Sequence, residues 1–257
     1  MNLLLAFFII SVTANLAMFV IAFYLKTDKL TDISYALTFV ILALIGLINA
    51  NFTFTAIILT FMICLWAARL GVYLLQRIRR IGKDKRFDGR RENFWSFLSF
   101  WLLQGITVWV VMLPSNLSYT SEVSKITIVS VIGITLWIAG LVIETVADYQ
   151  KYKFINDSNN KGKWIDTGLW KYSRHPNYFG EIALWIGIYL FTLPGLSTLQ
   201  AFIGLLGPVY IASLIMFVSG IPLLEKSSDA RWGNDKNYQM YKKRTSVLVL
   251  LPNSNDQ

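Results

Sequence analysis

The 257-residue chain has few charged residues, one cysteine and one histidine. Charged residues make up 15% of it, whereas an average soluble domain carries about 25%. Because Cys64 has no partner in the chain, the disulfide framework of a small secreted fold is excluded. Because His175 is alone as well, a metal site built on a pair of histidines is excluded, and we expect no bound metal.

Apolar residues dominate the composition instead. They make up 55% of the chain, and the mean hydropathy is +0.50. Several apolar runs reach the roughly 20 residues that a helix needs to cross a bilayer. We therefore predict an all-α, polytopic integral membrane protein, with a single membrane domain over 1–257. The seven predicted transmembrane helices cover 3–25, 33–49, 53–77, 93–113, 123–144, 179–193 and 200–222.

The basic residues are distributed unevenly between the predicted spans. All Lys and Arg residues except Arg69 and Lys125 lie in four segments, which are 26–32, 77–92, 145–178 and the tail after 222. Seven spans bring these segments to one side of the membrane. Since Lys and Arg mark cytoplasmic loops, we expect the N-terminus outside and the C-terminus in the cytoplasm. The net charge of +9 is then a topology signal, and we expect membrane lipid but no nucleic acid as a partner.

Ionisable residues at membrane depth are costly and often mark a functional site. The third predicted span and the loop after it carry Trp66, Arg69, Tyr73, Arg77 and Arg80 at steps of three and four residues, so they share one helix face. This stripe could bind a phosphate-bearing ligand, because guanidinium groups bind phosphate through two hydrogen bonds. The alternative is that Arg69 extends along the helix to the membrane surface.

Two further clusters lie at the inner ends of the fifth and sixth spans. Glu144 and Asp148 share one helix face and need a cation or hydroxyl donors, such as those of a ribose, unless they belong to an interfacial ion-pair lattice. Pro176 suits the first turn of a helix, and Asn177 and Glu181 then lie on one face of that helix. The free N–H groups of such a helix start attract anions, with Arg174 and His175 just outside it; a simple cap is the alternative.

A fourth cluster follows the last span. It consists of Glu225, Trp232, Tyr238, Tyr241 and Arg244, and an amphipathic surface helix is the alternative explanation. All four clusters lie at the predicted cytoplasmic ends of spans. We therefore expect them to converge on one pocket that is open to a water-soluble cofactor and that admits a lipophilic substrate from the bilayer.

The motif Ser173-Arg-His-Pro-Asn-Tyr-Phe-Gly-Glu181, preceded by Gly168-Leu-Trp170, resembles the signature of the steroid 5-alpha-reductase superfamily. The likeness is closest to a branch of membrane proteins of undefined substrate. It extends over roughly 60–252 and includes the segments 66–73, 143–154 and 218–225 and the Tyr-x-x-Tyr tail. Sterol reductases and isoprenylcysteine and phospholipid methyltransferases share the Arg-His-Pro-x-Tyr core.

The resemblance implies a seven-helix reductase that uses NADPH. Residues that match the family's cofactor contacts are Asp148, Lys151, Trp170, Asn177, Tyr178, Glu225 and Tyr241, and Arg69, Arg77 and Arg174 look like phosphate-side or carboxamide-side contacts. In this interpretation Asn177 holds the nicotinamide and Glu181 orients it. Steroid-reducing members carry a tyrosine shortly before the arginine that matches Arg69, whereas this chain has Trp66 there. Tyr73 or Tyr35 would then have to donate to the substrate carbonyl.

The resulting hypothesis is an oxidoreductase that acts on a carbon–carbon double bond of a steroid- or isoprenoid-like lipophilic substrate. Its catalytic residues would be Asn177, Glu181 and Tyr73. Two alternatives stay open, which are a methyltransferase that uses S-adenosylmethionine and a lipid-binding or transport protein without enzymatic activity. The expected location is the bacterial inner membrane or the endoplasmic reticulum.

Overall fold

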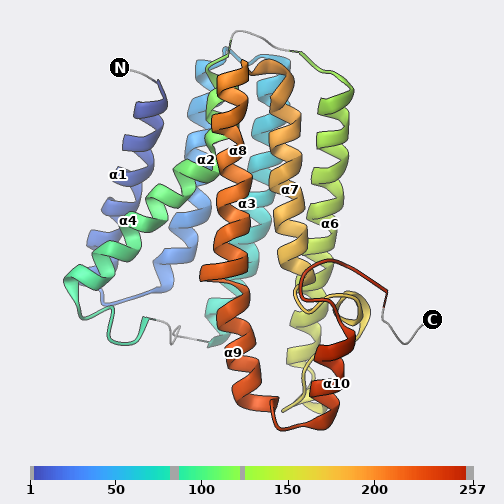
Figure 1. Cartoon of the computed structure of the whole chain (residues 1–257). Helices are drawn as coiled ribbons and strands as arrows, with labels where there is room; N and C mark the ends of the chain where they lie inside the picture. The colour runs from blue at the N-terminus through green and yellow to red at the C-terminus, as the bar shows by residue number, and fades with distance from the viewer. Residues whose placement is uncertain (1–2, 82–86, 122–124, 253–257) are drawn as a thin grey trace. The chain divides into compact units, whose positions relative to one another are not determined.

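The computed structural model describes residues 3–81, 87–121 and 125–252, and of residues 76–81 the backbone alone (Figure 1). Within these residues, seven helical segments are long and apolar enough to cross a membrane, as predicted, so the protein is an integral membrane protein. They are α1 (Leu3–Tyr24), α2 (Lys29–Asn49), α3 (Phe54–Ile81), α4 (Phe94–Val111), α6 (Ile128–Asn156), α7 (Pro176–Thr192), and α8 (Thr198–Ser213) continued by a π-helix (Leu214–Val218) and α9 (Ile221–Trp232).

Several predicted boundaries differ from the structure. The fifth helix does not cover 123–144, because α6 begins at Ile128 and continues to Asn156, well beyond the end of its apolar run. The sixth begins at Pro176, in agreement with the proline signal and earlier than the apolar run from 179. The connection predicted over 114–122 contains a short buried helix, α5 (Leu113–Tyr119), with Pro114 in its first turn, where a missing N–H costs nothing.

The chain forms two compact units, which comprise 1–133 with 188–207 and 134–187 with 208–257. In the first unit a buried polar network links α1, α2 and α4. The Gln104 amide donates to Asn15 Oδ1 over 2.8 Å and lies 3.3 Å from Ser34 Oγ, and the Asn15 amide donates to Thr38 Oγ1 over 3.2 Å. Hydrogen bonds of this kind hold helices together where apolar burial gives no driving force. The sequence analysis did not identify this network.

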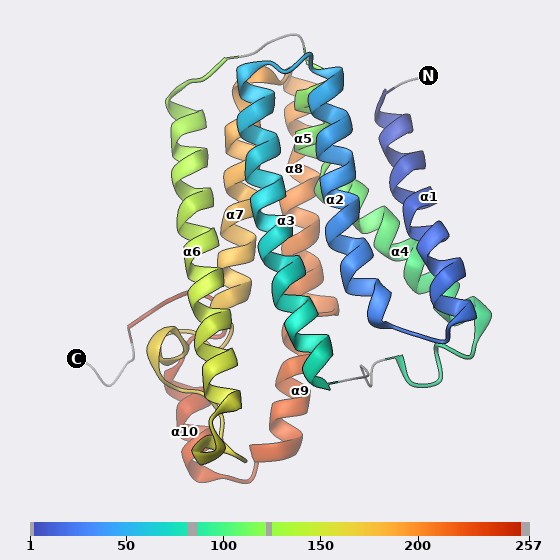
Figure 2. The same cartoon turned by 180° about the vertical axis from the view of Figure 1, so that it is seen from behind.

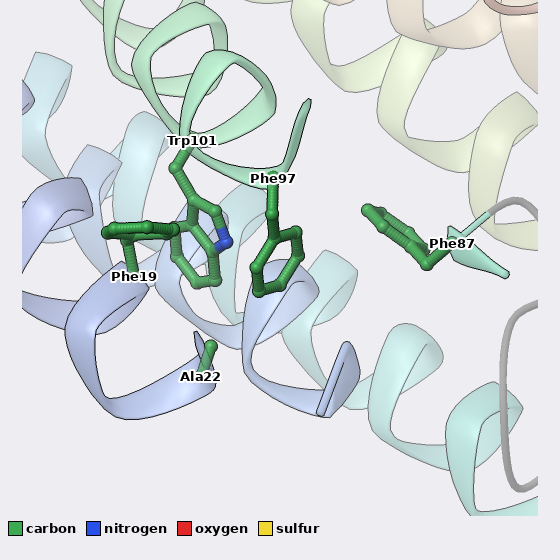
Figure 3. Packing of buried hydrophobic residues seen from close by; sticks show 5 residues of the cluster. All are labelled: Phe19, Ala22, Phe87, Phe97 and Trp101. Carbon is green, nitrogen blue, oxygen red and sulfur yellow. The ribbon is translucent and has the colours of Figure 1, made fainter. Parts of the chain in front are cut away.

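An aromatic cluster at the N-terminal end of α4 forms part of the core of the first unit. Figure 3 shows Phe19 and Ala22 of α1 beside Phe97 and Trp101 of α4, with Phe87 entering from the connection before α4. The Phe87 and Phe97 rings meet edge to face with their centroids 6.2 Å apart. Part of the basic 77–92 segment is therefore packed into the protein.

Arg91 belongs to that segment and forms a buried ion pair. Its Nε donates to Asp28 Oδ1 over 2.7 Å, and the two side chains are 5% and 2% exposed. We expect Arg91→Met to cost about 3–5 kcal/mol, because it leaves the Asp28 carboxylate buried without its cation. Thermal unfolding in detergent measures the loss. Arg90→Met removes an exposed neighbour and should leave the melting temperature unchanged, and equal melting temperatures for the two variants would contradict the prediction.

Candidate functional site

The second unit is built on a close contact between α6 and α7, which run side by side in Figure 2. A Cβ atom on Gly180 would lie 2.6 Å from the Gly140 carbonyl oxygen and 2.6 Å from the Glu144 amide nitrogen. Backbone therefore meets backbone, as is common between membrane helices with small residues at the interface. This contact places Glu144 against the second turn of α7. Asp148 follows one turn later on α6, and both carboxylates are buried.

The segment before α7 is docked on α6. It contains the 3-10 helix η3 (Gly168–Lys171), entered through Gly168 with a φ of +61°. The Leu169 amide donates to the side-chain oxygen of Gln150 over 2.9 Å, and the Trp170 indole N–H donates to the Ala147 carbonyl over 3.1 Å. Lys151 Nζ lies 4.9 Å from the centre of the Trp170 ring, a cation–π distance. Trp170 and Lys151 are thereby brought to the face of α6 that carries Asp148.

Glu225 of α9 joins this segment to the last part of the chain. Its carboxylate accepts a hydrogen bond from Arg174 Nη1 over 2.7 Å and one from His175 Nε2 over 2.9 Å. Lys242 Nζ, from α10 (Lys236–Arg244), lies 3.2 Å from the same carboxylate. The contacts of Glu225 fix Arg174 and His175 directly before the first turn of α7.

Burial lowers the pKa of His175 below its ordinary 6.5, and Lys151 and Arg174 act in the same direction, against the opposing effect of Glu225. The imidazole is therefore neutral at pH 7. Because Nε2–H donates to Glu225, Nδ1 is left as an acceptor. Among the described residues, neither His175 Nδ1 nor Arg174 Nε has a hydrogen-bond partner, although both atoms are buried.

The first two turns of α7 carry Asn177, Tyr178 and Glu181, all half-buried. The Tyr178 ring stacks on the His175 ring with their centroids 5.8 Å apart. The amide of Asn177 makes no hydrogen bond within the described part of the chain. It is therefore available to a ligand at the start of this helix.

Tyr241 of α10 is buried against η3. Its hydroxyl donates to the Trp170 carbonyl over 2.9 Å, the side chain is buried, and burial raises its pKa well above 10. The polar groups of Trp170 and Tyr241 are thus both used within the protein. Their hydrogen bonds hold η3 between α6 and α10.

The remaining predicted residues belong to α3 in the first unit. Arg69 is half-buried, with its guanidinium carbon 5.9 Å from the centre of the Tyr73 ring. Trp66 is fully buried and packs edge to face on Phe39 at 4.9 Å, so its indole fills the core. Phe39 also contacts the ring of Tyr35. The side chain of Arg77 lies outside the described residues.

The structure therefore brings nine of the predicted residues into the second unit, which are Asp148, Lys151, Trp170, Arg174, Asn177, Tyr178, Glu181, Glu225 and Tyr241. Sequence reasoning missed the contact of Lys242 with Glu225 and the acceptor left on His175. Lys242 had no signal, since it is one of three consecutive basic residues on a surface helix. His175 was noted only as a neighbour of the helix start.

The model of one protein family matches residues 18–245, and its description is protein of unknown function (DUF1295). Neither a curated protein nor a solved structure matches the chain.

Proposed function

The chain belongs to the DUF1295 family, and on this premise we propose that it is an NADPH-dependent membrane reductase of the steroid 5-alpha-reductase kind. Its substrate would be a lipophilic steroid- or isoprenoid-like molecule with a polarised carbon–carbon double bond. The family match covers the motif Ser173–Glu181 through which the chain resembles that superfamily. The basic segments would face the cytoplasm, in a bacterial inner membrane or the endoplasmic reticulum.

The observation that carries the proposal is the arrangement of polar groups at the start of α7. Arg174 and His175, held by Glu225, each keep one buried polar atom without a partner among the described residues. A guanidinium donor and an imidazole acceptor, with the half-buried amide of Asn177, fit a ligand that carries both phosphate oxygens and N–H or O–H groups. The buried Glu144 and Asp148 carboxylates are suited to ribose hydroxyl donors. These residues fit a nicotinamide dinucleotide.

In this proposal NADPH, when bound, supplies a hydride, and the protein supplies orientation and charge. Asn177 would hold the nicotinamide, and Glu181 would orient it. Lys151 and Arg174 offset the phosphate charge. Tyr73 of α3 would donate a proton to the polarised substrate.

Binding of NADPH to the detergent-solubilised protein, measured by isothermal titration calorimetry, tests the proposal. We expect Arg174→Gln to raise the Kd by about 10- to 100-fold, because one charge-assisted hydrogen bond contributes about 1.5–3 kcal/mol. Arg231→Gln is the matched control, since Arg231 is exposed on α9 and should leave the Kd unchanged. Asn177→Ala should act mainly on kcat if its contact tightens in the transition state.

A parallel titration with S-adenosylmethionine tests the methyltransferase alternative, since methyltransferases share the Arg-His-Pro-x-Tyr core with this chain. Binding of S-adenosylmethionine without binding of NADPH would overturn the reductase proposal. NADPH binding without oxidation across a broad panel of lipids would favour a lipid-binding protein that uses the dinucleotide as a ligand.

A further inference from the structure

The end of the chain, residues 245–251, lies along the segment that leads into α7; we call these residues the C-terminal strap. The Arg174 amide donates to the Ser246 carbonyl over 2.8 Å, and the Ser173 hydroxyl donates to the Leu248 carbonyl over 2.8 Å. The Leu251 amide reaches back to the Tyr172 carbonyl over 3.3 Å. Figure 1 shows the strap, in red, passing beside that segment. The strap therefore holds the backbone on which Arg174 and His175 stand.

Exposure alternates along the strap. Val247, Val249 and Leu251 are 42%, 46% and 52% exposed, whereas Ser246 and Leu248, whose carbonyls accept the hydrogen bonds, are half-buried. Leu250 is half-buried as well. The strap is thus hydrogen-bonded to the protein along its backbone, and one of its two side-chain faces presents a row of branched apolar side chains. Contiguous apolar side chains that are exposed on a protein often mark a site of contact with a membrane or a partner.

The neighbourhood of the strap identifies what covers this apolar row. The strap is bonded to Arg174, and the apolar span α7 begins two residues later, so the strap lies at the level of a membrane boundary. Exposed tyrosines surround that level, namely Tyr172 beside the strap and Tyr149 and Tyr152 on α6. Tyrosine is enriched where a membrane meets water.

Charge points to the same occupant. Lys243 and Arg244 directly precede the strap and are exposed, and Lys171 lies on the segment that the strap holds. Basic residues next to an apolar insertion are attracted to anionic headgroups. The apolar row and its basic flank therefore fit an anionic lipid surface.

We propose that the C-terminal strap lies in the lipid–water interface of the leaflet that borders the basic segments. Val247, Val249 and Leu251 insert among the acyl chains, and the strap thereby fixes the segment that carries Arg174 and His175. The lipid contact does not depend on any activity. The proposed function enters only if the fixed segment, with Arg174 and His175, binds NADPH.

Labelling at single cysteines tests the lipid contact. In a Cys64→Ala background, Val247, Val249, Leu251 and the alternate Leu248 and Leu250 are each replaced by cysteine and labelled with bimane. The proteins are reconstituted in phosphatidylcholine–phosphatidylglycerol vesicles, with lipids spin-labelled near the headgroup as one quencher and aqueous iodide as the other. Val142→Cys on α6 and Lys163→Cys in the exposed turn are the lipid and water controls.

The lipid quencher should act at 247, 249 and 251 at least about as strongly as at 142, and clearly less at 248 and 250, as alternate exposure requires. Iodide quenching at all five positions, with none from lipid, would overturn the proposal. So would shielding found in native membranes but lost in pure lipid vesicles, because that result would assign the row to a protein partner.

A second measurement does not depend on labelling. The triple variant Val247→Ser, Val249→Ser and Leu251→Ser keeps every hydrogen bond of the strap. In vesicles it should increase amide hydrogen exchange at 172–175 several-fold and leave α1 unchanged. Unchanged exchange at 172–175 would contradict the fixing role, whatever the protein does with NADPH.

Discussion

Gly180→Ala should destabilise the protein, although alanine is the better helix former. The added Cβ would lie 2.6 Å from the Gly140 carbonyl and the Glu144 amide, and neither backbone atom can rotate away. Alanine gains about 1 kcal/mol of helix propensity over glycine. Overpacking of a close contact costs about 1–3 kcal/mol, and more where backbone must shift. We therefore expect a lower melting temperature, measured in detergent by tryptophan fluorescence.

Gly71→Ala is the matched control in α3. There the added Cβ would meet only the Cβ of Ala36, at 3.7 Å, an ordinary van der Waals distance. This variant should keep or raise the melting temperature, because alanine adds up to about 1 kcal/mol of helix propensity to the free energy of unfolding. If Gly180→Ala behaved like Gly71→Ala, α6 and α7 would not meet at Gly140 and Gly180.

The same contact bears on the site. Separating α6 from α7 moves Glu144 and Asp148 away from Asn177 and Glu181, which lie on the facing helix. If these residues form one binding site, Gly180→Ala should weaken NADPH binding as well as stability. Arg91→Met, which acts in the first unit, should lower stability without touching these residues, so it separates general loss of fold from local loss of the site.

The membrane spans could be predicted from the sequence because apolar length alone decides whether a helix crosses a bilayer. Helix ends could not be predicted as well. The polar residues that follow Glu144 end the apolar run but not α6, since polar residues can continue a helix. Pro176 predicted the start of α7 better than hydropathy did, because proline at the first position has a steric reason that hydropathy lacks.

The candidate site was predictable only in its separate pieces. Each cluster carried a local signal, such as the four-residue spacing of Glu144 and Asp148. The contact of Glu225 with Arg174 and His175 joins residues about fifty positions apart, and no local pattern encodes such a pair. The buried pair of Asp28 and Arg91 was missed for the same reason, since Arg91 reads as one more basic loop residue.

Glu225→Gln should have the largest effect on the proposed cofactor site. The substitution keeps the shape of the side chain but removes the charge that Arg174, His175 and Lys242 share. Hydrogen bonds to charged groups contribute about 1.5–3 kcal/mol, so loss of the charge should raise the Kd for NADPH by about 10- to 100-fold. Calorimetric titration measures the change.

Asp229→Asn is the matched control, because Asp229 also accepts from Lys242, over 2.7 Å, but its side chain is 48% exposed. An exposed ion pair contributes about 0–1 kcal/mol, so this variant should bind NADPH almost as the wild type does. Equal losses for Glu225→Gln and Asp229→Asn would show that Lys242, and not the arrangement of Arg174 and His175, limits binding.

The single histidine gives this prediction a readout that does not depend on NADPH. Nuclear magnetic resonance of the untagged protein reports the pKa of His175 without overlap. In the wild type burial holds this pKa below 6.5, while the Glu225 carboxylate raises it in part. Glu225→Gln removes the raising effect, so the pKa of His175 should fall further, and the imidazole should stay neutral to a lower pH.

The same change in pKa affects stability. Since protons then bind the unfolded chain more tightly than the folded one, acidification below pH 6.5 should destabilise Glu225→Gln more than the wild type. A pKa that rises in the variant would mean that Glu225 does not accept from His175, and the arrangement at the start of α7 would have to be built on other contacts.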